Sequence, residues 1–322
     1  PPAWKARSLS FCLPTHTLGE HVRLLGMSLT TLNHVSVGRP ITKFGFSIYP
    51  VYKWGSGDND LTVIRPNELV KIREMESPTV PTLVVENNNG VPVVLFAGET
   101  IEGGRQQRVL NQTVVLPPMS VTEIPVSCVE QGRWHGAQEF GGVGRMSPSN
   151  VRRSASRGMQ HEVWNEVEEL LQSRAIRSNT MALGDYFGDV DVEADAKRRE
   201  KIAKVASWGP LAGQTGIVVT RGSQIQSVDL FGSQQFLDAM WPKMIESALG
   251  ANVAPTSVHS RRDSGDRVLK FLSRLSKTID ETPRTSSTGL GEHLRIENEY
   301  FTGQALTLDG ALVHASAFPS AD

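Results

Sequence analysis

The chain has 322 residues, of which 39% are hydrophobic and 29 are glycine, so it can bury a full core. Lysine and arginine number 33 against 34 aspartate and glutamate residues, and the net charge of -1 excludes a global field that would pull the protein onto nucleic acid or an anionic membrane. Cys12 and Cys128 are too few for a disulfide scaffold. We expect a protein of a reducing cytoplasm, with neither a secretory signal nor a membrane span.

Residues 30–135 predict a β-rich region. Its apolar segments are short, rich in β-branched residues and separated mostly by Gly, Pro or Asn, as in TLVVE, VPVVLF, RVLNQTVVL and VTEIPVSCVE. Asn89-Gly90 predicts a tight hairpin between TLVVE and VPVVLF, because Asn-Gly accepts the positive φ angles of such turns. Pro117-Pro118 predicts a second reversal. Consecutive hairpins favour an antiparallel β-sandwich or a barrel-like arrangement.

Residues 136–160 are rich in Gly, Ser and Arg, with almost no periodic apolar positions, and predict a long loop. All formal charge between Glu139 and Glu162 is positive. It comes from Arg145, Arg152, Arg153 and Arg157. A passive linker and a lid that closes on an anionic ligand both fit this composition.

Residues 161–319 predict helices and closing strands. Apolar residues recur at helical spacing around Trp164, Trp241 and Leu272, and VDVEADAKRREKIAKVA predicts an exposed helix. Strands return in TGIVVTRGSQIQSVDLFG and in the segment up to Pro319, where Asp309-Gly310 predicts a hairpin. Because the chain starts and ends in strands, we expect a single α+β domain over residues 1–322.

The first concentration of polar chemistry is GETIEGGRQQR, residues 98–108. Paired glycines let a ligand approach the backbone, arginine suits carboxylate or phosphate, and glutamine suits sugar hydroxyls. A polar ligand pocket and a hairpin with internally paired Glu and Arg side chains both remain open. The residues concerned are Glu99, Glu102, Gly103, Gly104, Arg105, Gln106 and Arg108.

The second concentration is SCVEQGRWH, residues 127–135. Cys128 continues an apolar stripe and is interpreted as structural. Glu130 and Arg133 follow at the strand end, where they could orient a polar ligand or pair with each other. One strand-turn-strand unit joins this segment to the first, so we expect the two to meet across a ladder and form one site.

Metal chemistry finds little support in the spacing of ligand residues. The sequence contains no HExxH motif, no cysteine pair at zinc spacing and no EF-hand pattern. Mg²⁺ could bind only if scattered carboxylates converge, namely those of Glu99, Glu102, Glu123 and Glu130. His314 lies among apolar neighbours and is interpreted as a core histidine.

The combination of GRQQR with VSCVEQGRW resembles the ARPP family, the ADP-ribosylglycohydrolase and rhodanese/phosphatase-superfamily-associated protein domain. Further matching segments, such as VDLFGSQQFLDAMWPKM, extend the resemblance over most of the chain from about Leu32. The family-like motif falls on Glu99, Gly103, Gly104, Gln106, Arg108, Cys128, Glu130, Arg133 and Trp134. Gln107 stands where many relatives have Asn, which keeps the hydrogen-bonding groups unchanged. The resemblance implies a part in NAD or ADP-ribose metabolism.

The leading hypothesis is a cytoplasmic protein that binds, and in its stronger form hydrolyses, a nucleotide-like anion such as ADP-ribose. Glu99 or Glu102 would act as general base, with or without Mg²⁺. The ligand would be bound by Gly103, Gly104, Arg105, Gln106, Arg108, Glu130, Arg133 and Trp134, with the indole stacked on a base.

The alternative hypothesis is a non-catalytic structural or self-assembling protein, in which the polar cluster is an internal or subunit-contact network. A homo-oligomer is compatible with either reading. Nucleic-acid binding through residues 145–157 rests on local charge alone, so we expect neither a nucleic acid nor a membrane as partner.

Overall fold

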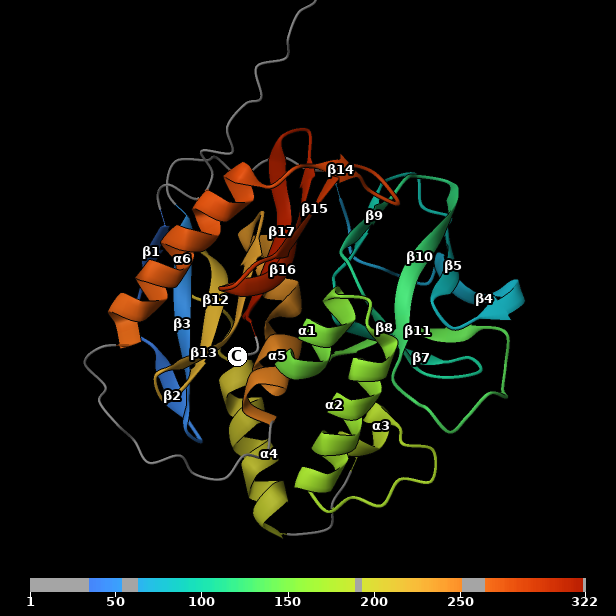
Figure 1. The fold of residues 1–322 in the computed structure, drawn as a ribbon, viewed down its shortest axis with the longest axis horizontal. Coiled ribbons are helices and arrows are strands. Elements are labelled where there is room, and N and C mark those ends of the chain that lie inside the picture. The colour runs from blue at the N-terminus through green and yellow to red at the C-terminus, as the bar shows by residue number, and fades with distance from the viewer. Residues whose placement is uncertain (1–34, 54–62, 189–192, 251–263, 321–322) are drawn as a thin grey trace, which may run out of the picture.

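The structure of the chain is a computed structural model that describes residues 35–53, 63–188, 193–250 and 264–320. Two antiparallel sheets dominate the described part, and helices lie between and beside them (Figure 1). The α+β class predicted from the sequence is therefore confirmed. None of the described helices combines the length and the apolar character needed to cross a bilayer.

The larger sheet has nine strands and joins segments from both ends of the described chain. Its strands are β1 (Val35–Val37), β2 (Ile41–Lys43), β3 (Phe46–Lys53), β12 (Gln214–Arg221), β13 (Gln224–Phe231), β14 (Thr285–Ser286), β15 (Glu292–Glu297), β16 (Phe301–Leu308) and β17 (Ala311–Pro319). They follow the order β1-β3-β12-β13-β17-β16-β15-β14, with β2 beside β3. The predicted Asp309-Gly310 hairpin is confirmed, because it joins β16 to β17 with φ angles of 51° and 76°.

The second sheet has six strands in the order β11-β7-β8-β10-β5-β4. They are β4 (Val70–Thr79), β5 (Thr82–Asn87), β7 (Glu99–Gly103), β8 (Arg108–Leu110), β10 (Ser120–Cys128) and β11 (Phe140–Met146). The sheet curls until its two edges approach, and the N–H of Glu74 in β4 donates to Gln138 O just before β11, at 2.9 Å. This curled sheet is the barrel-like half that the sequence predicted.

The helices bury the apolar faces of both sheets (Figure 1). They are α1 (Ser149–Ser156), α2 (Gln160–Ser173), α3 (Leu183–Tyr186), α4 (Glu193–Ala206), α5 (Gln234–Gly250) and α6 (Ser264–Glu281). On α6, Val268, Leu272, Leu275 and Ile279 recur every three or four residues and face one side of the nine-stranded sheet. α5 packs against the opposite side of that sheet, with Leu237 and Met240 fully buried.

The hairpin predicted at Asn89-Gly90 is wrong. β5 pairs with β4 and β10, whereas the following strand β6 (Val93–Leu95) pairs with β9 (Val114–Leu116) in a separate ladder. Side-chain hydrogen bonds explain the difference, because Asn87 Nδ2 donates to Pro117 O at 2.8 Å and its Oδ1 accepts the Asn89 N–H at 3.0 Å. The asparagines thus direct the chain from one ladder to the next.

The long loop predicted for residues 136–160 is also wrong, because this segment contains β11 and α1. Its glycines hide the strand signal. Gly144 lies so close to the side chains of Glu102 and Thr100 that no Cβ would fit, and two register shifts interrupt the β11–β7 ladder. In α1, the buried face consists of Val151, Arg152, Ser154 and Ala155, which a purely apolar pattern cannot reveal.

Candidate functional site

The two polar segments singled out in the sequence do meet in space, though not through the expected unit. β9 and β10, on either side of Pro117-Pro118, do not form a common ladder, and the contact comes instead from β8, which pairs with β10 and places Arg108 opposite Cys128. Beyond the ladder, Val129 N donates to Gln107 O at 3.0 Å. Residues 105–108 and 128–134 therefore lie together at one end of the curled sheet.

The centre of this meeting point is the ion pair of Glu130 and Arg133. Arg133 donates Nε to Glu130 Oε1 at 2.8 Å and Nη2 to Oε2 at 2.6 Å, while its Nη1 donates to Gly104 O at 2.8 Å. The carboxylate also accepts the Gln107 N–H and the Thr180 hydroxyl, each at 3.0 Å. Burial acts to raise the pKa of Glu130, but these donors outweigh it and lower that pKa.

A second group of residues surrounds Trp134, and we call it the Trp134 cluster: Glu74, Arg105, Gln106, Arg108 and Trp134. The side chains of Arg108 and Glu74 are fully buried and lie 3.7 Å apart, from Nη2 to Oε1. The indole of Trp134 is 42% exposed and lies 5.7 Å from the guanidinium carbon of Arg108. Burial lowers the pKa of Arg108.

Glu99, the first predicted general base, lies apart from these contacts. Its carboxylate is fully buried, with Oε1 held by Arg65 Nη2 and by Lys243 Nζ, the latter at 2.9 Å, and Oε2 held by the Phe96 N–H at 2.9 Å. Burial acts to raise the pKa of Glu99, but the two cations outweigh it and lower that pKa. Arg65 and Lys243 line a surface groove of about 510 Å³ that Glu99 itself does not reach.

Glu102, the other predicted base, is exposed and lies beside Gly144. The paired glycines after it are explained by packing within the protein. Gly104, with a φ of 59°, lies against the ring of Phe140, where a Cβ would clash, and Gly103 has a φ of 102°. The role of Gly103 and Gly104 in approaching a ligand stays a prediction.

Cys128 is fully buried, and burial raises the pKa of its thiol. Among the described residues, no group of three or more His, Cys, Asp and Glu side chains is arranged to hold a metal ion. Glu99 and Glu130 each direct their carboxylates at cations of the protein, Arg65 and Lys243 for the first and Arg133 for the second.

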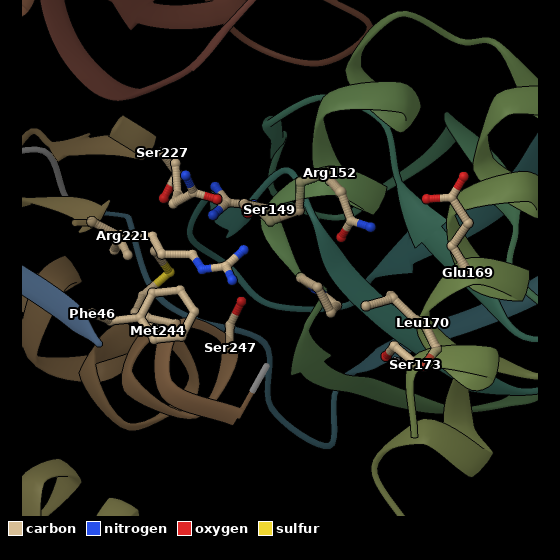
Figure 2. Close-up of a pocket in the computed structure, with 15 residues that line it drawn as sticks. Phe46, Ser149, Arg152, Glu169, Leu170, Ser173, Arg221, Ser227, Met244 and Ser247 are labelled. Carbon is tan, nitrogen blue, oxygen red and sulfur yellow. Dashed lines mark hydrogen bonds between the residues drawn. The ribbon is translucent and has the colours of Figure 1, made fainter. Parts of the chain in front are cut away.

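An open cavity lies elsewhere, in the cleft shown in Figure 2. We call it the central cleft. It encloses about 330 Å³ between the nine-stranded sheet, α5 and the start of α1, with the C-terminal part of α2 on the far side. Figure 2 shows the guanidinium group of Arg221, at the end of β12, directed into the space beside Ser247. The other polar lining residues are Ser149, Asn150, Arg152, Glu169, Ser173, Gln226 and Ser227.

The wall of the cleft is fixed by a buried ion pair. Arg152 binds Asp229 with both terminal nitrogens, from Nη2 to Oδ1 and from Nη1 to Oδ2 at 3.1 Å. Nε of Arg152 is buried without a hydrogen-bond partner. The arginine fits because Gly98 has no side chain: a Cβ there would lie 2.6 Å from Arg152 Nε. The first glycine of the GETIEGG motif thus makes room for a wall of the cleft.

The ion pair continues into the core through His314. Its Nε2 lies 3.6 Å from Asp229 Oδ1, and its Nδ1 shares a hydrogen bond of 2.8 Å with the hydroxyl of Thr113. Burial lowers the pKa of His314, and the nearby Asp229 offsets this only in part. Burial acts to raise the pKa of Asp229, but Arg152 and His314 outweigh it and lower that pKa. The sequence-based interpretation of His314 as a core histidine is confirmed.

The central cleft has no counterpart among the sites predicted from the sequence. The sequence predicts a loop at Arg152, and Arg221 and Ser227 belong to no motif. A usable signal was Pro148-Ser149-Asn150, since proline followed by small polar residues is typical of a helix start. That helix start would have pointed to a ready anion site.

Comparisons with known proteins place the chain in a family. No curated protein and no solved structure matches it. A family model does match residues 34–318, nearly the whole chain, and its description is ARG and Rhodanese-Phosphatase-superfamily-associated Protein domain. The chain therefore belongs to the ARPP-1 family.

Proposed function

We propose that the protein binds a small phosphate-bearing ligand of the nucleotide or sugar-phosphate class in the central cleft. The family description, with its ARG and rhodanese-phosphatase association, supports a role beside enzymes that process such compounds. ADP-ribose and NAD are the ligands that the sequence resemblance suggests. The cleft volume of about 330 Å³ lies at the small end of ligand pockets and suits one phosphate and its sugar better than a whole dinucleotide.

The observation that carries the proposal is the start of α1. Pro148, Ser149 and Asn150 line the cleft, and no side chain caps this helix. The first N–H groups of a helix have no acceptor within it and carry the positive end of the helix dipole, so they favour an anion. Arg221 adds a full positive charge to the same space.

Several of the other lining residues suit the sugar, whereas Glu169 places a carboxylate on the α2 side of the cleft. Ser173 and Ser227 offer hydroxyls that can donate or accept, and Gln226 adds an amide. Phe46 and Met244 supply an apolar wall on the side of the nine-stranded sheet and α5. A phosphate near the helix start with its sugar along the hydroxyls uses both kinds of surface.

Calorimetric titration with inorganic phosphate, ribose 5-phosphate, ADP-ribose and NAD, with and without Mg²⁺, tests the proposal. Arg221→Ala should weaken phosphate binding about 10- to 150-fold, because a hydrogen bond to a charged group contributes about 1.5–3 kcal/mol. Arg267→Ala is the matched control, because Arg267 is exposed on α6, which covers the other face of the sheet. Equal affinities for the two variants, or no binding at all, would refute the proposal.

A second variant tests the same proposal with a substitution that should not destabilise the fold. Ser149→Asp puts a carboxylate where the anion would bind, and acidic residues in the first turn of a helix are stabilising. We expect it to abolish phosphate binding without lowering Tm, whereas Ser149→Asn should retain binding. Hydrolysis stays a prediction: neither Glu99 nor Glu102 lines the cleft, so ligand turnover by Glu99→Gln should equal that of the wild type unless the catalytic assignment is right.

The second candidate function, a purely structural role for the polar cluster, is favoured by the ion pair between Glu130 and Arg133. Glu130 and Arg133 bind each other through two hydrogen bonds, and Arg133 Nη1 also donates to Gly104 O. Light scattering over a range of concentrations tests the subunit-contact form of this idea, because a concentration-independent monomer contradicts it.

A further inference from the structure

We propose that Glu169 binds the two adjacent hydroxyls of a ribose whose phosphate lies at the start of α1, so that the central cleft selects ribose phosphates over deoxyribose phosphates. This inference rests on the function proposed above and deepens it, because it names the sugar. It depends on a carboxylate that the phosphate site itself does not use.

The first observation is a ladder of ion pairs between α1 and α2. Arg157 Nη1 donates to Glu162 Oε2 at 2.8 Å, next to the short connection between the two helices. One helical turn further, Arg153 Nη2 donates to Glu166 Oε1 at 3.1 Å, and Asn150 Nδ2 donates to Glu166 Oε2 at 2.7 Å. The two helices therefore run in opposite directions, with basic side chains of α1 facing acidic side chains of α2.

The next rung of this ladder has a carboxylate but no cation. Residues three or four apart lie on one face of a helix, so Ser149 on α1 comes level with Glu169 on α2. Both residues line the central cleft. Within the part of the chain that the structure describes, Glu169 makes no ion pair and no hydrogen bond. Its carboxylate is therefore available to a group from outside the protein.

The second observation is the position of Glu169 in the cleft. Figure 2 shows Glu169 and Ser173, from successive turns of α2, across the space from Arg221. The two sides of the cleft thus differ in charge. A ligand that spans it needs an anion on the Arg221 side and hydrogen-bond donors on the α2 side, because a second anion would be repelled by the carboxylate.

The vicinal diol of ribose has the matching chemistry. Two hydroxyls on adjacent ring carbons can each donate to one carboxylate oxygen, and an acidic side chain that accepts from ribose hydroxyls recurs in dinucleotide-binding folds. The hydroxyl of Ser173 adds a neutral partner on the same side. Because a hydrogen bond to a charged group is stronger than one between neutral groups, Glu169 sets the preference for the diol.

Calorimetric titration with ribose 5-phosphate and 2-deoxyribose 5-phosphate tests the proposal, in EDTA so that no metal ion bridges ligand and carboxylate. The deoxy sugar lacks one hydroxyl, and the loss of one hydrogen bond to a carboxylate should weaken its binding to the wild-type protein about 10- to 150-fold. Glu169→Ala should remove this preference, so that both ligands bind equally. Alanine is a strong helix former, so the fold should persist at this exposed position.

Glu168→Ala is the matched control. Glu168 is the neighbouring exposed carboxylate of α2, its Oε1 accepts from Gln172 Nε2 at 3.0 Å, and it does not line the cleft. The control removes the same charge, so a general effect of charge on anion binding appears in both variants. Glu168→Ala should keep the wild-type preference for ribose. Inorganic phosphate should bind both variants at least as tightly as it binds the wild type.

The outcomes separate this inference from the function on which it rests. If inorganic phosphate binds but the wild type binds the two sugar phosphates equally, the role of Glu169 is overturned and the phosphate site stands. A preference for ribose that survives in Glu169→Ala, or that falls equally in Glu168→Ala, would overturn it as well. If neither inorganic phosphate nor either sugar phosphate binds, the proposed function fails and this inference fails with it.

Discussion

The central cleft and the network around Glu130 are built from the same residue types, arginine with a carboxylate and hydroxyl or amide side chains, yet they leave different groups for a ligand. In the network, the donors of Arg133 are used by Glu130 and by the carbonyls of Gly104 and His135. In the cleft, the start of α1 has no side-chain cap. Composition alone therefore identifies polar chemistry, but the hydrogen-bond partners decide whether it is structural or open to a ligand.

The largest expected effect is the loss of the ion pair behind the cleft. Asp229→Ala leaves Arg152 buried without its carboxylate, and we expect the free energy of unfolding in urea to fall by about 3–5 kcal/mol. Glu292→Ala, which breaks an exposed pair with Arg284, should cost less than about 1 kcal/mol. If both variants lost the same small amount, the cleft wall would not depend on this pair.

A smaller loss of stability is expected when a neutral isostere weakens the network around Glu130. Glu130→Gln keeps the shape of the side chain but removes the charge that accepts from Arg133, Gln107 and Thr180. We expect the free energy of unfolding, measured by urea denaturation, to fall by about 1.5–3 kcal/mol, with phosphate binding unchanged. A loss of phosphate affinity with unchanged stability would instead give Glu130 the ligand-orienting role predicted from the sequence.

Acid should destabilise the fold in two stages. His314 and His293 have pKa values lowered by burial, so below about pH 6.5 the unfolded chain takes up protons that the folded one does not. Each such group adds a slope of about 1.4 kcal/mol per pH unit. The lowered pKa values of Asp229, Glu99 and Glu130 contribute stability that is present above their ordinary values and lost as the pH falls further. The urea concentration at the midpoint of unfolding, measured between pH 8 and 4, follows this loss of stability. Stability that rose on acidification would contradict the assignment.

The smallest effect concerns Cys128. Because the thiol is fully buried and its pKa is raised, alkylation by iodoacetamide at pH 7 should be far slower in the folded protein than in urea. Peptide mapping by mass spectrometry follows modification at this position alone. Rapid reaction in the folded state would reopen a chemical role for Cys128.

Much of the fold follows from patterns that the sequence shows directly. β-branched runs, the Asp309-Gly310 turn and the apolar stripe of α6 each act locally, and the structure confirms them. The hairpin predicted at Asn89-Gly90 is wrong because the side chain of Asn87 donates to Pro117 O and accepts the backbone N–H of Asn89. The long loop predicted for residues 136–160 is wrong for two reasons. Glycine permits close packing in β11, and a buried arginine replaces an apolar residue in α1.

The candidate site was harder to predict, for a physical reason. The sequence correctly indicated that residues 98–108 and 127–134 contain elements that meet, since β8 pairs with β10. It could not show that Glu99 faces Arg65 and Lys243, which come from distant segments. The cleft likewise depends on Arg152, Arg221 and Ser227, which only the packing of α1 against the nine-stranded sheet brings together.

The pairing of β3 with β12 has a consequence for biosynthesis. About 160 residues separate the two strands. At a translation rate of about 5–20 residues per second, one edge of β3 therefore stays unpaired for on the order of 10–30 seconds until β12 is synthesised. An unpaired edge is a template for association between chains. Nascent chains of this protein should therefore depend on chaperones that shield β-rich intermediates, and slower synthesis should lengthen that dependence.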